Sequence, residues 1–114
     1  MTDDNNRVHL VGRVSAAPET RVLPSGDEVV SFRLIVRRSA AALRRSKQVV
    51  DTIECSAFTA AMRRTVSRLE AGSEVDVTGA LRRRFTRGGG AISFVTVEVD
   101  SCRKVAVPAV ASGA

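Results

Sequence analysis

The sequence has few of the side chains on which catalysis usually depends. Its 114 residues include one histidine and two cysteines, with no tryptophan and no tyrosine. His9 lies in a predicted strand, where a lone histidine is usually solvent-facing or packed, and no motif places a nucleophile beside it. Asp51 and Glu54 are three positions apart in another predicted strand, so they point to opposite faces and make a poor acid–base pair. We therefore predict that the protein is not an enzyme.

Metal-binding and targeting signals are equally scarce. Cys55 and Cys102 are too few for a disulfide framework or a four-cysteine zinc site, so we expect reduced thiols and no cofactor; a disulfide within or between subunits is the alternative. Residues 1–6 are polar and acidic, unlike a signal peptide, and the apolar run 105–111 is too short to span a bilayer. We expect a cytoplasmic protein without membrane contact.

Negative charge is in short supply. There are 18 Lys and Arg residues against 12 Asp and Glu, which gives a net charge of +6, and only Lys47 and Lys104 are lysine. A high-GC genome would favour arginine over lysine but would not explain the positive excess. Arginine offers a planar group that matches phosphate and stacks on bases. A small basic domain therefore indicates a polyanionic partner, either a nucleic acid or an anionic membrane surface.

The hydrophobic pattern has a period of two over most of the chain, which predicts β-strands. One segment, 59–72, has helical spacing, with Thr59 as its N-cap and Gly72 at its end, and we expect about three turns. Three strands, one helix and two strands is the layout of the OB-fold, a five-stranded Greek-key barrel. An SH3-like barrel or an open sheet would fit the periodicity nearly as well. We expect strands over 8–14, 30–37, 49–58, 75–81 and 94–101, turns at Pro18 and 23–27, a single domain over 6–105, and flexible ends at 1–5 and 106–114.

Two basic clusters are the best candidates for a binding site. They occupy a predicted loop, 37–47, and a predicted hairpin loop, 82–91, which would flank the binding face of an OB-fold and form a positive groove. Arg82 and Arg84 should share one face and Arg83 the other. Charged loops are often merely solvated, and charge alone does not separate DNA from RNA. The predicted contacts are Arg37, Arg38, Arg44, Arg45 and Lys47 in the first cluster and Arg82, Arg84 and Arg87 in the second.

The four phenylalanines are divided between binding and packing. Phe85 lies among arginines and Phe58 ends a strand, so we predict both as base-stacking rings, although Phe58 would serve equally in the core. Phe32 and Phe94 are assigned to packing. Each base–ring stack contributes about 1–3 kcal/mol, so two rings alone would bind weakly. Electrostatics would supply the rest, and affinity should fall steeply with salt.

Several short motifs resemble, in the same order, those of the bacterial single-stranded DNA-binding protein family. They are residues 6–13 (NRVHLVGR), 18–21 (PETR), 24–26 (PSG), 31–34 (SFRL) and 72–82 (GSEVDVTGALR). The resemblance implies an OB-fold, assembled as a homotetramer or a dimer and associated with the nucleoid. It implies binding of single-stranded DNA without sequence preference, in replication, recombination and repair. Phe58 falls on a family stacking position, and Phe85 lies near another that is commonly tryptophan.

The chain also departs from that family. Ala40 and Thr52 stand where well-known members carry tryptophan, and the last residues, 110–114, lack the acidic tip through which the family recruits other proteins. We interpret the chain as a tail-less paralogue or a truncated form, and expect no recruitment of replication proteins through a tail. Two alternatives stay open: a primosome-type accessory OB protein that binds DNA and a helicase, and a protein-interaction barrel that docks an acidic partner.

Overall fold

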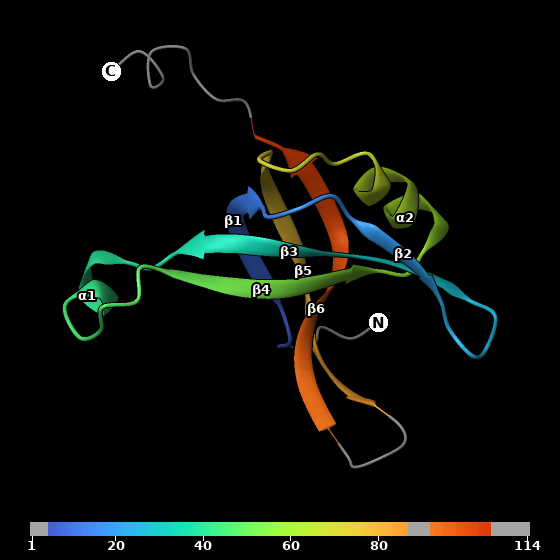
Figure 1. Ribbon diagram of the computed structural model, residues 1–114, viewed down its shortest axis with the longest axis horizontal. Coiled ribbons are helices and arrows are strands. Elements are labelled where there is room, and N and C mark those ends of the chain that lie inside the picture. The colour runs from blue at the N-terminus through green and yellow to red at the C-terminus, as the bar shows by residue number, and fades with distance from the viewer. Residues whose placement is uncertain (1–4, 87–91, 106–114) are drawn as a thin grey trace.

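The computed structural model describes residues 5–86 and 92–105. Over these residues it contains six strands and two short helices (Figure 1). Neither helix is long and apolar enough to cross a membrane. In chain order the elements are β1 (Val8–Val14), β2 (Glu19–Val22), β3 (Glu28–Arg37), α1 (Ala40–Leu43), β4 (Val50–Ala57), α2 (Ala60–Ser67), β5 (Glu74–Thr86) and β6 (Ile92–Lys104).

Five of the strands close into a barrel. β1 pairs with both β3 and β5, and the circuit continues from β5 through β6 and β4 back to β3. Every pairing in it is antiparallel except that of β4 with β6, where Cys55 lies opposite Val97. This closure confirms the predicted OB-fold and excludes the open sheet.

The barrel core is formed by the side chains on the inward-facing side of each barrel strand. Val14, Leu34, Val75, Val77 and Val97 are all at most 1% exposed. Phe32 is buried among them, as predicted. Gly12 and Gly79 permit the close approach of neighbouring strands, because a Cβ at either position would overlap the carbonyl oxygen of Ile35 or Glu98.

Helix α2 covers one end of the barrel. It begins as predicted, with the Thr59 hydroxyl accepting a hydrogen bond from the Met62 amide at 3.2 Å. Val66 and, just past the helix, Leu69 add their side chains to the core. The helix spans eight residues rather than the expected three turns, since Arg68 already caps it. Gly72 follows with a φ of 89°, a conformation that favours glycine.

Three segments differ from the sequence prediction. β2 is an exposed strand that pairs with the edge of β3, between the predicted turns. None of its side chains is buried, so its sequence does not alternate between apolar and polar residues. α1 is a single turn inside the predicted loop 37–47, and the Ser39 hydroxyl caps it. Residues 82–86, predicted as hairpin loop, continue β5 and pair with β6 up to Thr86 opposite Ile92. The predicted flexible ends and the tip of this hairpin fall largely outside the described residues.

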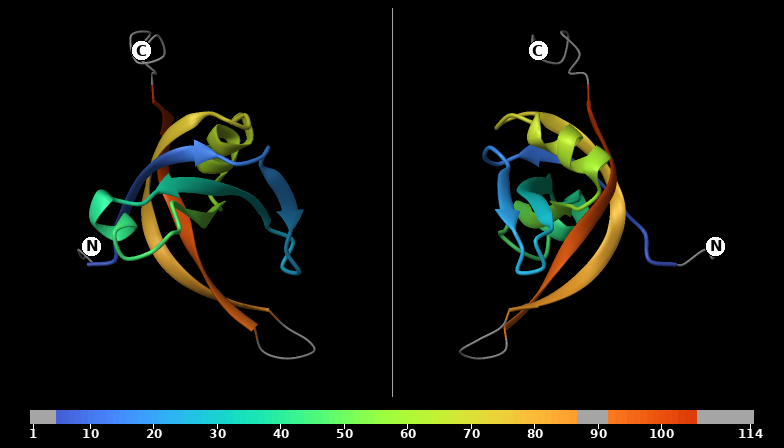
Figure 2. Two further views of the ribbon diagram at one scale, coloured as in Figure 1. Left: turned by 60° about the vertical axis from the view of Figure 1, so that its left-hand side comes forward. Right: turned by 90° about the vertical axis from the view of Figure 1, so that its right-hand side faces the viewer.

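The extended ends of β5 and β6 project from the barrel. We call residues 81–86 and 92–96 the arm. In Figure 2 the arm leaves the barrel on the side away from α2. Leu81 and Val95 on it are each 48% exposed, because at these positions the two strands have no barrel to pack against.

Candidate nucleic-acid interface

Strand β4 forms the middle of an outward-facing surface. Cys55 and Ala57 point into the core, so Ser56 between them faces outward at the barrel wall. Ser56 lies beside Ser31 of β3 on one side and Glu98 of β6 on the other. The outer side chains of β3, β4 and β6 therefore form one surface, which the arm continues.

A pocket opens at one end of this surface. It encloses about 370 Å³ between the turn that joins β2 to β3 and the base of the arm. We call it the Phe58 pocket, because Phe58, at the end of β4, lies in its wall. The other lining residues that matter here are Arg21, Arg84, Phe85, Phe94 and Thr96.

Arg84 lies across the ring of Phe58. Its guanidinium carbon is 4.6 Å from the ring centroid, a cation–π contact. The same guanidinium is 3.7 Å from Glu98 Oε1, the carboxylate oxygen to which Arg82 Nε donates at 2.8 Å. Arg82 and Arg84 thus share one face of β5, as predicted. Arg83 points the other way and donates from Nη1 to the Ser93 hydroxyl at 3.1 Å.

Two further rings lie at the pocket, and one of them was predicted wrongly. Phe85 is 67% exposed, which leaves its ring open to solvent. Phe94, assigned to packing from the sequence, is 40% exposed and lines the pocket with Phe85. Val97 and Val99 take the inward face of β6 and are buried, whereas Phe94 lies on the opposite face with Thr96, across from Arg84. The ring of Phe94 is therefore directed away from the core.

The first basic cluster lies at the opposite end of β4. The pairing of β3 with β4 runs from Val30 opposite Ala57 to Arg37 opposite Val50, which at about 3.3 Å per residue spans roughly 23 Å. Phe58 follows Ala57 at the first end. α1 lies beyond the second end (Figure 1). Exposed basic side chains surround α1; these are Arg37, Arg44, Arg45 and Lys47.

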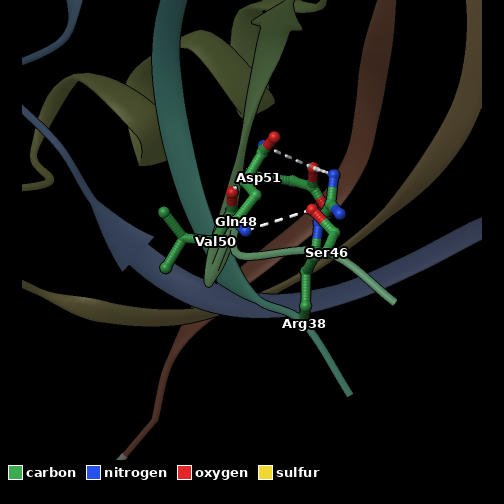
Figure 3. Close-up of polar contacts among 5 residues, drawn as sticks. All are labelled: Arg38, Ser46, Gln48, Val50 and Asp51. Carbon is green, nitrogen blue, oxygen red and sulfur yellow. Dashed lines mark hydrogen bonds and ion pairs between the residues drawn. The ribbon is translucent and has the colours of Figure 1, made fainter. Parts of the chain in front are cut away.

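Arg38, the remaining member of that cluster, is held by an ion pair. Its Nε and Nη2 donate to Asp51 Oδ2 and Oδ1 at 3.0 and 2.8 Å, and Gln48 Nε2 donates to Asp51 and to the Val50 carbonyl (Figure 3). The hydrogen bond to Arg38 lowers the pKa of Asp51 and raises the pKa of Arg38. The ion pair joins the two ends of the loop between β3 and β4.

Sequence reasoning missed several residues of the surface, including Ser56 and Glu98. Arg21 lines the Phe58 pocket from β2, and Thr96 lines it from β6. Arg33 is exposed on β3 and pairs with Glu54, its Nε lying 3.4 Å from Glu54 Oε1. The β-branched residues within 19–22, directly before a Pro-Ser-Gly turn, are the signal that would have indicated β2. Arg87, a predicted contact, lies outside the described residues.

His9 and the two cysteines lie away from this surface. His9 is exposed on β1, with Nε2 2.8 Å from Asp76 Oδ1. Cys55 and Cys102 are free thiols in the core. Burial raises the pKa of Cys55 to about 12 and also raises the pKa of Cys102. Neither thiol is therefore prepared for chemistry at neutral pH.

A closed five-stranded barrel with a helix between β4 and β5 defines the chain as an OB-fold protein. A model of the single-strand binding protein family matches residues 5–104, so the chain belongs to that family. This confirms the resemblance of the motifs.

Curated relatives agree with this assignment. Single-stranded DNA-binding protein 1 of Staphylococcus aureus is 36% identical over 92 residues, which are 80% of this chain and 54% of the relative. The single-stranded DNA-binding protein of Bacillus cereus is 35% identical over 83 residues, 73% and 48% of the two chains. Single-stranded DNA-binding protein A of Bacillus subtilis is 34% identical over 98 residues, 84% and 56%. The chain spans about half the length of these relatives.

Proposed function

We propose that this protein binds single-stranded DNA along the outer surface of β3, β4 and β6 and on the arm. The observation that carries the proposal is the Phe58 pocket, where a guanidinium lies on one ring and two other rings are exposed. Bases stack on exposed rings whatever their sequence, and arginine neutralises phosphates. Duplex DNA keeps its bases stacked inside and offers no free face to these rings.

The proposed path of the strand runs from the Phe58 pocket toward α1. At the pocket, Phe58, Phe85 and Phe94 would hold bases, with Arg84 and Arg21 beside them. Toward α1, binding would depend on phosphate contacts with Arg37, Arg44, Arg45 and Lys47, since the described residues there include no exposed ring. Family membership and the names of the relatives support single-stranded DNA as the ligand.

We further propose that the protein acts by binding rather than by catalysis, as a homotetramer in the cytoplasm, associated with the nucleoid, in replication, recombination and repair. The single-domain fold and family membership support this role. Sedimentation velocity across a concentration series would test the assembly, and a monomer at all concentrations would contradict it.

Fluorescence anisotropy with labelled oligo-dT, the matching duplex and an RNA of the same sequence tests the ligand. We expect binding of oligo-dT at low salt, with a log–log salt slope of about −0.7 for each phosphate contacted, and much weaker binding of the duplex. Equal affinity for duplex and single strand would contradict the proposal. No binding of any nucleic acid would favour a barrel that docks an acidic protein.

A further inference from the structure

The Phe58 pocket contains a hydroxyl group without a hydrogen-bond partner. Thr96 of β6 is 2% exposed, and its Oγ1 has no hydrogen bond to any described residue. The side chain lies on the outer side of β6, opposite Arg82 and away from the core, and it lines the pocket. A buried hydroxyl without a partner destabilises the protein, whereas a methyl group in its place would not.

A second group in the same pocket is also unpaired. Arg84 Nη2 is buried and forms no hydrogen bond within the described part of the chain. The carboxylate of Glu98, at 3.7 Å, is close enough for charge attraction but too far for a hydrogen bond. The residues that line the pocket therefore include an N–H group and a hydroxyl, and neither forms a hydrogen bond within the described part of the chain.

Buried polar groups in proteins are nearly always paired, so two unpaired ones in a single pocket call for an explanation. A ligand that brings an acceptor into the pocket would supply the missing bonds. A phosphate stays with the backbone in solvent and would reach Arg84 at the rim more easily than Thr96, which is almost fully enclosed. The edge of a base, unlike a phosphate, can follow the rings into the pocket that Thr96 and Arg84 both line.

We propose that the Phe58 pocket reads a carbonyl oxygen on an inserted base, with the Thr96 hydroxyl and Arg84 Nη2 as its donors. Thymine, guanine and cytosine carry such an oxygen and adenine does not. This inference rests on the proposed binding of single-stranded DNA and adds to it a preference at one subsite. Ser56, also buried, adds another hydroxyl to the lining of the pocket.

The test compares oligo-dT with the same strand made from difluorotoluene nucleotides, a nonpolar isostere of thymine that keeps its shape and lacks its carbonyls. The variant is Thr96→Val, which preserves the β-branched side chain and removes the hydroxyl. Thr78→Val is the matched control, because Thr78 lies on β5 beside His9 and outside the pocket. Melting temperature is measured for each protein alone, and affinity for each strand by anisotropy.

We expect Thr96→Val to weaken binding of oligo-dT by about two- to tenfold, the effect of one hydrogen bond. It should leave binding of the isostere strand unchanged and the melting temperature unchanged or higher. Thr78→Val should bind both strands as the wild type does.

Two results would overturn the inference while the proposed function stands. One is equal affinity of the wild type for both strands, and the other is a Thr96→Val variant that retains the wild-type preference for oligo-dT. If the wild type binds neither strand at low salt, the proposed function itself fails and the subsite fails with it.

Discussion

The two basic regions of this protein look alike in the sequence and differ in the structure. Around α1, the exposed cations lie on a short loop, and the ion pair between Arg38 and Asp51 joins the two ends of that loop. On the arm, Arg82 and Arg84 are carried on paired strands and share a carboxylate, and Arg84 lines a pocket with three rings. The difference shows that equal charge does not mean equal chemistry. The α1 region is suited to phosphates alone, whereas the arm is suited to bases as well.

The strongest test of this difference is Phe85→Ala on the arm. Phe85 is 67% exposed, so its removal should leave the fold intact. Loss of one stacked base should weaken binding by about 1–3 kcal/mol, or roughly 5- to 150-fold, with no change in salt slope. Anisotropy titrations of oligo-dT over a salt series measure both quantities. A flattened slope with little loss of affinity would mean that the ring only supports neighbouring arginines.

The complementary change is made at α1. The double variant Arg44→Ala, Arg45→Ala removes two exposed cations and no ring. It should reduce the salt slope by about 1.4 and weaken binding about tenfold near physiological salt. The pair Arg64→Ala, Arg68→Ala removes the same charge from around α2, outside the proposed path, and serves as the control. Equal effects of the two pairs would show that net charge, not position, governs binding.

Arg38 should behave as a structural residue, unlike its neighbours. Its partner Asp51 has a lowered pKa in the folded protein, so the pair stabilises the fold at pH values above the ordinary carboxyl pKa of 3.8. That stabilisation is lost as the pH falls through the lowered pKa that Asp51 has in the folded protein. The wild type should therefore melt higher than Asp51→Asn at pH 7, and the difference should shrink on acidification.

Glu70→Gln, which removes an exposed carboxylate just after α2, is the control for this pH series. A gap between wild type and Asp51→Asn that stays constant down to strong acid would show that the ion pair contributes nothing. A salt slope reduced as much by Arg38→Ala as by Arg44→Ala would place Arg38 among the phosphate contacts instead.

The smallest expected effect concerns the barrel that carries both regions. Because burial raises the pKa of Cys55 to about 12, its thiol should stay protonated and enclosed near neutral pH. We expect little labelling of native protein by a thiol-specific reagent at pH 8, full labelling in denaturant, and no effect of added oligo-dT. Rapid labelling in the native state would show that the barrel opens.

The barrel could be predicted from the sequence because burial on one side of each strand imposes alternation. The strands around Leu34, Val77 and Val97 show this pattern, and each forms. β2 has no buried side, so the pattern is absent there. Phe94 was assigned to packing, although the alternation that buries Val97 and Val99 places Phe94 on the opposite face of β6.

The membership of the site was less predictable than the fold. Phe58, Phe85 and Arg84, which the sequence analysis named as candidate contacts, line one pocket. The pairing of Arg38 with Asp51 and the position of Thr96 in the pocket lining depend on strand register. Register is set by contacts between segments far apart in the chain, and local spacing does not contain it.

The carboxylate of Glu98 bears on how salt will affect the arm. Free arginines on a protein surface are matched by mobile ions from solution, and single-stranded DNA carries its own condensed ions, which are released when it binds. Arg82 and Arg84 instead share an anion that is covalently part of the chain and cannot leave. A phosphate that reaches these arginines must compete with the Glu98 carboxylate, whose local concentration is high and does not change with added salt. The arm would therefore contribute less to the salt slope than its number of arginines suggests. It would also release its DNA strand more readily for exchange.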